Sequence, residues 1–386
     1  HHRRPPDRVL AKEVAARAWD DDQTAAQGIY HFLLLDPGMS PFDSDKAITE
    51  LAPDEVKLLK EWRKGLTAKY TEKDKQRLAA LSKQVELLYA RAARERGRLM
   101  EKIASRESVW GQPEGSKNPF NIAAREKMLA LLKQPGTAYS RLKQAMDLWC
   151  ALWAWPLEQA ALLPSRTQFW SLLEGILGVS TSIADLPDVT EQLELIPSAV
   201  RPSEPPPAPE LEGDVKAEDV LSVAAQAAAS LRPLHWELEF SEVFVQRGGF
   251  DLTVGNPPWI RLDWSEAGVL SDIDPRIELD GLSASDIAKR RTTLVTGSFL
   301  STYLEAAIQV LGTQAFLGAV STYPVLAGVR TNLYKCFIAT AWRIGSGIVG
   351  LVHQDGLFDD PHGGVLRAAL YSRLRLVAQF KNELVL

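Results

Sequence analysis

The sequence predicts an α/β protein in which a parallel sheet occupies the second half and a mainly α-helical region precedes it. In the second half, short apolar runs of β-forming residues alternate with helix-like segments; the runs are residues 250–255, 315–321 and 347–353. Strands that alternate with helices indicate a parallel sheet. In the first half, apolar residues recur at steps of three and four, which is the spacing of one helix face.

The clearest helical signal lies within residues 55–108. Four apolar residues share one helix face: Leu78, Leu81, Val85 and Leu88. Proline and glycine are absent from residues 71–95, which allows one long helix, and residues 55–66 can supply an antiparallel mate. We therefore expect a helical hairpin that projects from the α/β body. Its role stays open between a spacer or partner-binding coiled coil and an ordinary hairpin packed on its own core.

Three further segments predict how the rest of the chain divides into regions. Residues 146–157 hold three tryptophans in seven residues, which predicts burial, because an apolar run this short belongs to a core more often than to a membrane. Residues 198–213 carry five prolines and three acidic residues, a composition typical of an extended, solvated linker. An alanine-rich helix is expected at residues 217–231. We therefore expect a helical accessory region at 1–197, a linker at 198–213 and a sheet-containing region at 214–386.

The net charge, the cysteines and the lengths of the apolar runs argue against several classes of protein. The 386 residues carry a formal net charge of -5, so bulk positive charge does not drive binding to nucleic acid, although local basic patches remain compatible with it. Cys150 and Cys336 lie far apart, so neither a disulfide framework nor a thiolate zinc site is expected. Neither a run of about 18 apolar residues nor a signal peptide is present. We expect a cytoplasmic protein with no membrane partner.

The most informative stretch is Asn256-Pro257-Pro258-Trp259, directly after the strand-like run at residues 250–255. Proline fixes its own backbone and biases the preceding residue toward extended geometry, so the loop presents its carbonyl groups in a fixed direction. The Asn256 side-chain oxygen and the Pro257 backbone carbonyl can both accept hydrogen bonds from one NH2 group, and Trp259 adds an aromatic plane. Such a loop can hold a planar ring with an exocyclic amine, as base-flipping enzymes do.

The same loop can activate that amine. Two acceptors that pull on the amine hydrogens make its nitrogen a better nucleophile toward a methyl donor held in line, so that positioning and polarisation supply the rate. The alternative is a structural turn that closes the strand and buries the tryptophan in the core.

A second candidate, residues 359–364, contains two acids and His362. Its residues are adjacent in the chain and have no distal partners, which is not the spacing of a metal site. It is interpreted as a solvated turn before a helix at residues 365–371, and no metal is expected.

With its preceding strand, the tetrapeptide resembles the catalytic motif of DNA methyltransferases that modify adenine N6. Other stretches are similar, in order, to the long methylases of type IIG restriction-modification systems and of the DISARM and BREX phage-defence systems; they are residues 30–39, 146–157, 234–244 and 350–384. The resemblance implies that residues 214–386 form part of a catalytic domain with a partial Rossmann-like methyltransferase sheet. It also implies S-adenosylmethionine as the methyl donor, double-stranded DNA with a flipped adenine as the substrate, and subunits of a phage-defence complex as candidate partners.

The resemblance assigns roles to the loop residues. Asn256 and Pro257 would bind and polarise the target amine, Pro258 would fix the loop, and Trp259 would stack on the flipped adenine. Three elements that follow would help to line the base pocket: a helix at residues 332–344, the strand at 347–353 and the loop to Phe358.

One feature of that family is missing, namely the glycine-rich loop that binds S-adenosylmethionine. Residues 35–43 echo it but lack the paired glycines. No cofactor-binding residues are therefore assigned, and the chain is interpreted as an incomplete piece that ends within a predicted strand, residues 376–386. We expect it to bind S-adenosylmethionine weakly or not at all. Two alternatives stay open: a protein glutamine-amide methyltransferase, whose substrate also presents a planar NH2, and a non-catalytic fragment whose helical half binds a partner.

Overall fold

The structure is a computed structural model that describes residues 28–103, 122–179, 208–329 and 332–380. The chain divides into two compact units. The first comprises His1–Pro37, Glu61–Trp155 and Gln159–Gly249, and the second comprises Gly38–Lys60, Pro156–Glu158 and Phe250–Leu386. Residues 198–207 of the predicted linker and residues 104–108 of the predicted hairpin lie outside the described residues.

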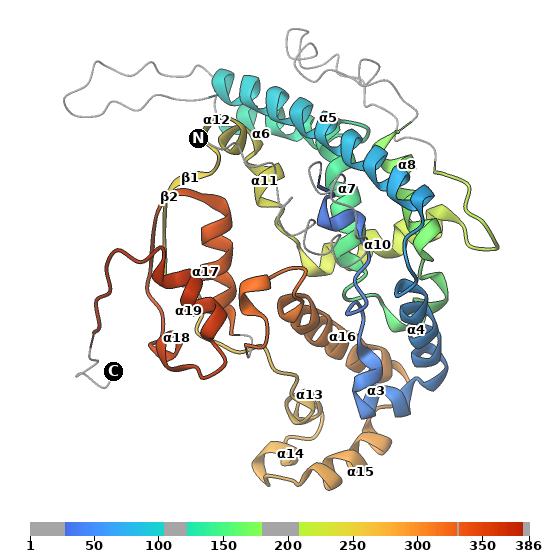
Figure 1. Cartoon of the computed structure of the whole chain (residues 1–386). Helices are drawn as coiled ribbons and strands as arrows, with labels where there is room; N and C mark the ends of the chain where they lie inside the picture. The colour runs from blue at the N-terminus through green and yellow to red at the C-terminus, as the bar shows by residue number, and fades with distance from the viewer. Residues whose placement is uncertain (1–27, 104–121, 180–207, 330–331, 381–386) are drawn as a thin grey trace. The chain divides into compact units, whose positions relative to one another are not determined.

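The first unit is built from helices (Figure 1). Its longest helix, α5, packs against α6, α7, α8 and α12, and α7 also packs against α10. Two helices cross the boundary between the units: α4 (Pro53–Leu66) and η3 (Leu157–Leu162). The helices that lie within the first unit are η1 (His31–Leu33), α5 (Glu72–Ile103), α6 (Ile122–Leu132), α7 (Ala138–Ala151), α8 (Arg166–Leu177), α10 (Ala217–Leu231), α11 (Trp236–Glu239) and α12 (Ser241–Arg247).

The predicted stripe of α5 is confirmed, but its predicted partner is wrong. Leu78, Leu81, Val85 and Leu88 are all buried. The extensive contacts of α5 are with helices from residues 122–247 rather than with α4. At about 1.5 Å per residue, the 14 residues of α4 span less than half of the 32 residues of α5, so α5 needs other helices to bury its stripe. The stripe therefore belongs to the core of the helical unit and not to a projecting hairpin.

The tryptophan-rich segment is part of the same core, as predicted. Trp149, Trp153 and Trp155 are all buried. The Trp149 indole N–H donates to the Leu34 carbonyl at 2.8 Å, so its polar atom is satisfied inside the core.

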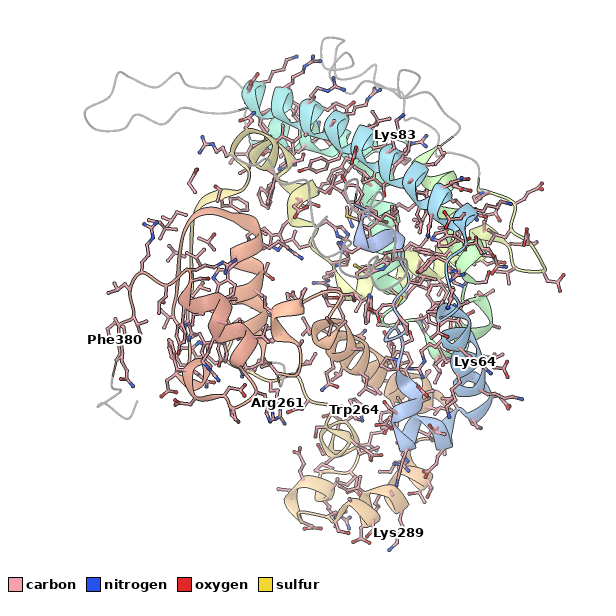
Figure 2. The ribbon with its side chains drawn as sticks, viewed as in Figure 1. Lys64, Lys83, Arg261, Trp264, Lys289 and Phe380 are labelled. Atoms are coloured by element: carbon pink, nitrogen blue, oxygen red, sulfur yellow. The ribbon has the colours of Figure 1, made fainter. Side chains whose placement is uncertain are left out.

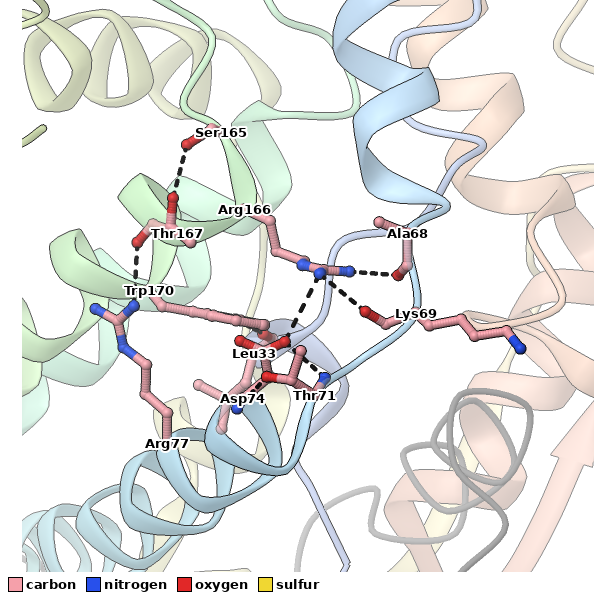
Figure 3. A network of polar contacts seen from close by, with 10 residues as sticks. All are labelled: Leu33, Ala68, Lys69, Thr71, Asp74, Arg77, Ser165, Arg166, Thr167 and Trp170. Carbon is pink, nitrogen blue, oxygen red and sulfur yellow. Dashed lines mark hydrogen bonds and ion pairs between the residues drawn. The ribbon is translucent and has the colours of Figure 1, made fainter. Parts of the chain in front are cut away.

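Trp170 of α8 is held from several sides at the N-terminal ends of α5 and α8. Its indole N–H donates to the Leu33 carbonyl at 3.0 Å, and the guanidinium groups of Arg77 and Arg166 lie 5.8 and 5.5 Å from its ring centre. Arg166 also forms an ion pair with Asp74 at 3.7 Å (Figure 3). Cations over an aromatic face are attracted by it, so the network fixes α5 against α8.

The second unit contains shorter helices and two strands (Figure 1). Its elements are η2 (Phe42–Ser44), α3 (Lys46–Leu51), β1 (Phe250–Gly255), α13 (Glu266–Ser271), α14 (Arg276–Leu279), α15 (Ala284–Leu294), α16 (Ser298–Gly318), η5 (Pro324–Leu326), α17 (Leu333–Ile344), β2 (Gly345–Leu351), α18 (Gly356–Asp359) and α19 (Gly364–Tyr371). A hydrophobic cluster joins α17, α18 and α19 through Tyr334, Ile338, Leu357, Leu366 and Leu370.

The expected α/β fold with a partial Rossmann-like methyltransferase sheet is wrong for the described residues. They are mostly helical, and their strands form one two-stranded parallel sheet, β1–β2. The strands at residues 250–255 and 347–353 are confirmed, the second with its start and its end two residues earlier than expected.

The expected strand at residues 315–321 is instead the end of α16 and the turn after it. A short apolar run fits a buried helix as well as a strand, and this one continues the buried face of α16, on which Leu317 follows Tyr303, Leu304, Ala307 and Ile308. The described part of the predicted terminal strand, residues 376–380, is neither helix nor strand.

Candidate functional site

The two strands bring the loops that follow them together. Thr253, Val254 and Gly255 of β1 pair with Val349, Gly350 and Leu351 of β2 in parallel register. The pairing continues one residue further, because the Val352 N–H donates to the Gly255 carbonyl at 3.0 Å. The tetrapeptide loop and the loop after β2 therefore begin side by side at the carboxyl ends of the strands, where parallel sheets place their ligand sites.

Asn256 is the polar residue that this edge presents to solvent. It is exposed, and its side chain makes no hydrogen bond within the described part of the chain. Pro258 is also exposed, whereas Pro257 is buried. Of the two expected acceptor residues, Asn256 is therefore open to solvent and Pro257 is not.

Trp259 is neither free nor buried. Its side chain is 43% exposed, and its indole N–H donates to the Val352 carbonyl at 3.2 Å. On the other side of the loop, the Ile260 carbonyl accepts a hydrogen bond from the Leu333 N–H at 3.0 Å, at the start of α17. The two hydrogen bonds tether the loop to the end of β2 and to α17 while leaving much of the indole accessible. The structural-turn alternative, which requires a buried tryptophan, does not describe this residue.

Aromatic side chains continue from the end of β2. His353, the next residue after the Trp259 acceptor, stacks on Tyr334 with ring centres 5.7 Å apart and planes 7° from parallel. The ring centre of Phe358 lies 6.4 Å from that of His353. These residues come from α17, the end of β2 and α18, which are the elements expected to follow the loop. The stack joins residues 19 positions apart, so no local pattern in the sequence could identify it.

Tyr334 supports this end of the sheet and is not a base. Burial raises the pKa of its hydroxyl, and the nearby Asp360 and Asp355 carboxylates raise it further. The hydroxyl therefore stays protonated at neutral pH. It lies beneath the loop after β2, where a side chain at Gly356 would contact its oxygen at 3.7 Å.

The turn predicted at residues 359–364 is confirmed between α18 and α19, with Asp359 as the last residue of α18 and Gly364 as the first of α19. Asp360 accepts a hydrogen bond from the His362 N–H at 2.9 Å and forms an ion pair with the buried Lys335. The hydrogen bond from Lys335 holds the pKa of Asp360 below its ordinary value. Among the described residues, His, Cys, Asp and Glu side chains nowhere gather in a group of three that could hold a metal ion.

The residues around the sheet do not fit S-adenosylmethionine, the donor that the resemblance implies. A site for it needs glycines that let the backbone approach the ligand. Gly347 instead allows the strands to approach, because a side chain there would lie 2.0 Å from the Asp251 carbonyl. Gly350 faces open space. These two glycines therefore do not build a donor site in this part of the second unit.

Searches of family models, of curated proteins and of solved structures found no match to this chain. The candidate site therefore rests on its own residues and their geometry. Within the described ranges, every helix is too short or too polar to cross a membrane.

Proposed function

We propose that this chain carries the amine-binding loop of an adenine-specific DNA methyltransferase, which transfers a methyl group from S-adenosylmethionine to adenine N6 in restriction-modification or phage defence. One observation carries the proposal: the exposed Asn256 carboxamide has no partner in the described chain and stands at the carboxyl end of β1, on the same loop as the tethered and half-exposed Trp259. An unpaired acceptor and an accessible aromatic plane on one loop suit a planar ring that carries an NH2 group.

Each residue of the loop has a separate task in this proposal. The Asn256 side-chain oxygen accepts a hydrogen bond from the adenine amine and polarises it. An acceptor at this position stabilises the positive charge that develops on the nitrogen during methyl transfer. Trp259 stacks on the base, and Pro258 limits the motion of the loop. The Pro257 carbonyl is the second acceptor, and Asn256 takes the larger share because Pro257 is buried.

The donor site belongs to another region of the enzyme in this proposal. The sequence has no glycine-rich loop of the family's form, and the residues around β1 and β2 do not fit the donor. The chain then binds the target base but lacks the complete donor site, and its partners are double-stranded DNA with a flipped adenine and subunits of a phage-defence complex. We also propose a cytoplasmic location, which the two free cysteines support.

A binding experiment on the chain itself tests the proposal without the donor. The probes are a DNA duplex with one unpaired adenine and the same duplex with N6,N6-dimethyladenine, which has no amine hydrogen to donate. We expect roughly fivefold tighter binding to adenine, equivalent to about one hydrogen bond, and no preference in the Asn256→Ala variant. Equal binding of both duplexes by the unmodified chain would contradict the proposal.

A third probe, a glutamine-containing peptide, separates the substrate classes. If the peptide binds in an Asn256-dependent manner and the adenine duplex does not, the protein-amide alternative replaces the DNA proposal. If neither probe depends on Asn256, the loop is not an amine-binding site and the chain is a non-catalytic piece.

A further inference from the structure

Three short stretches, each of two residues, meet at the candidate site in the second unit. One follows β1, one begins α17 and one follows β2. In that order they are residues 259–260, 333–334 and 352–353. Each stretch contacts the other two, so the contacts form a closed ring, which we call the clamp.

Two hydrogen bonds of the clamp hold the loop after β1. The Trp259 indole N–H donates to the Val352 carbonyl at 3.2 Å, and the Leu333 N–H donates to the Ile260 carbonyl at 3.0 Å. The first bond lies near solvent, since Val352 is 54% and Trp259 43% exposed. A hydrogen bond that competes with water contributes little by itself, so a freely moving Val352 carbonyl would hold the indole only weakly.

The third contact of the clamp is the stack of His353 on Tyr334. Their ring centres lie 5.7 Å apart and their planes are 7° from parallel. Tyr334 is buried in the hydrophobic cluster of the second unit, and the His353 Nδ1–H donates to the Gln354 carbonyl at 2.8 Å, so both rings are restrained. The Val352 carbonyl belongs to the planar peptide unit that joins Val352 to His353. The stack therefore restrains the acceptor of the Trp259 indole.

We propose that His353 is a positioning residue for the base-stacking tryptophan: by stacking on Tyr334 it aims the Val352 carbonyl and thereby holds the Trp259 ring in one orientation. This inference rests on the proposed function, in which Trp259 stacks on the flipped adenine. His353 acts through Trp259 in this role and is not a contact of the base. A ring that is already oriented loses less conformational freedom when a ligand binds, so a looser ring binds the base less tightly.

Exchange of the Trp259 indole hydrogen tests the clamp in the full chain without any ligand. NMR of isotope-labelled protein detects indole N–H groups, and the signal that disappears in Trp259→Phe is that of Trp259. We expect this hydrogen to exchange about fivefold faster in His353→Ala than in the unmodified chain. In His353→Phe, which can still stack on Tyr334, the rate should stay close to that of the unmodified chain. An unchanged rate in His353→Ala would overturn the proposal.

Arg261 supplies the matched control. It is the next residue after Ile260, on the segment that leads from β1 toward α13 (Figure 2), and its side chain forms an exposed ion pair with Asp263. Arg261→Ala should therefore leave the exchange rate of the Trp259 indole hydrogen unchanged. An acceleration equal to that in His353→Ala would show that any change near the loop loosens the indole, and the assignment to His353 would fall.

Duplex binding connects the clamp to the proposed function. The probes are again the duplex with one unpaired adenine and the duplex with N6,N6-dimethyladenine. His353→Ala should weaken binding of both duplexes about fivefold, because both bases stack, and should leave the preference that depends on Asn256 intact. In a Trp259→Ala background, His353→Ala should cause no further loss.

The outcomes separate the two proposals. A further loss of the same size in the Trp259→Ala background would show that His353 acts on the base without Trp259, which overturns the positioning role. Unchanged duplex binding in Trp259→Ala, together with faster indole exchange in His353→Ala, would refute the stacking role of the tryptophan and retain the clamp. Unchanged exchange in His353→Ala, together with weaker duplex binding in Trp259→Ala, would refute the clamp and retain the proposed function.

Discussion

Trp170 in the helical unit and Trp259 in the second unit make the same kind of hydrogen bond in opposite surroundings. The indole N–H of Trp170 donates to the Leu33 carbonyl at 3.0 Å, and that of Trp259 donates to the Val352 carbonyl at 3.2 Å. Trp170 is fully buried, with two guanidinium groups over its ring, whereas Trp259 is 43% exposed. A satisfied indole N–H therefore does not distinguish a core tryptophan from a binding surface. The exposure of the ring does.

The contrast extends to the polar groups around each ring. Near Trp170, Arg77 pairs with Glu174 through two hydrogen bonds of 2.5 and 2.7 Å, and Arg166 pairs with Asp74. Next to Trp259, the Asn256 side chain has no partner in the described chain. An unpaired polar group beside an exposed ring keeps its hydrogen-bonding capacity for a ligand. The first unit is thus built for stability at this tryptophan, and the second is built for access.

The largest expected effect is on the buried ring. Trp170→Ala should lower the free energy of unfolding by about 3 to 5 kcal/mol, because it opens a large cavity and removes the support of two cations. Urea unfolding measures the loss. Trp259→Ala is the matched control, and its free energy of unfolding should fall by less than about 1 kcal/mol because the ring is already half in water. Equal losses in the two variants would remove the contrast on which the site assignment depends.

The second-largest expected effect is on the methylation rate and concerns the unpaired side-chain amide of Asn256. In an enzyme that joins this chain to a donor-binding region, Asn256→Ala should slow single-turnover methylation of DNA by a factor on the order of a hundred to a thousand, or roughly 2.7 to 4 kcal/mol, by analogy with the loss of one preorganised oxyanion-hole donor. Asn256→Asp should be milder because it retains an acceptor. Both variants should unfold at the temperature of the unmodified protein. An active Asn256→Ala enzyme would end the methyltransferase assignment.

A smaller effect should separate stacking from polarisation. Trp259→Ala should weaken binding of the duplex with an unpaired adenine by about 1 to 3 kcal/mol, the cost of one lost base–aromatic stack. The preference for adenine over N6,N6-dimethyladenine should persist, since Asn256 is intact. Fluorescence anisotropy with both duplexes measures the two quantities together. Unchanged affinity in Trp259→Ala would mean that the exposed ring does not contact the base.

Sequence periodicity predicted the parts of the fold that local chemistry determines. The run 250–255 became β1 with the expected ends, since Pro257 and Pro258 cannot continue a strand ladder. Residues 217–231 became α10, and the stripe of α5 is buried. The same reasoning failed at residues 315–321, where an apolar run only seven residues long fits a helix as well as a strand.

The sequence predicts the residues of the candidate site but not their contacts. The tetrapeptide selects Asn256 and Trp259 as candidates because proline geometry acts on neighbours in the chain. The tether of Trp259 to Val352 joins residues 93 positions apart and depends on the pairing of β1 with β2. Neither strand determines by its own sequence that it pairs with the other. The sequence likewise could not show that Pro257 is buried, since its burial depends on the same tertiary contacts.

The smallest expected effect is a difference between the two units in how the free energy of unfolding depends on pH. In the helical unit, Asp147 accepts hydrogen bonds from Lys143 at 2.6 Å and from His235 at 2.7 Å. Burial raises the pKa of Asp147, but the hydrogen bonds from His235 and Lys143 outweigh it and leave the pKa below its ordinary value. The unfolded chain therefore binds this proton at a higher pH than the folded chain. The stabilisation is fully present above the unfolded pKa of about 3.9 and is lost as the pH falls through the lower folded value.

The Asp147→Asn variant should remove that dependence. At neutral pH it should lower the free energy of unfolding by no more than about 1 kcal/mol, because the pair is partly exposed and solvent screens it. Its free energy of unfolding should then fall less steeply than that of the unmodified protein as the pH decreases from about 5. Asp263→Asn is the matched control in the second unit. Its carboxylate also pairs with a cation, Arg261, but both side chains lie in solvent, so urea unfolding should give the slope of the unmodified protein. A flatter slope in Asp263→Asn than in Asp147→Asn would show that the acid sensitivity does not belong to the Asp147 pair of the helical unit.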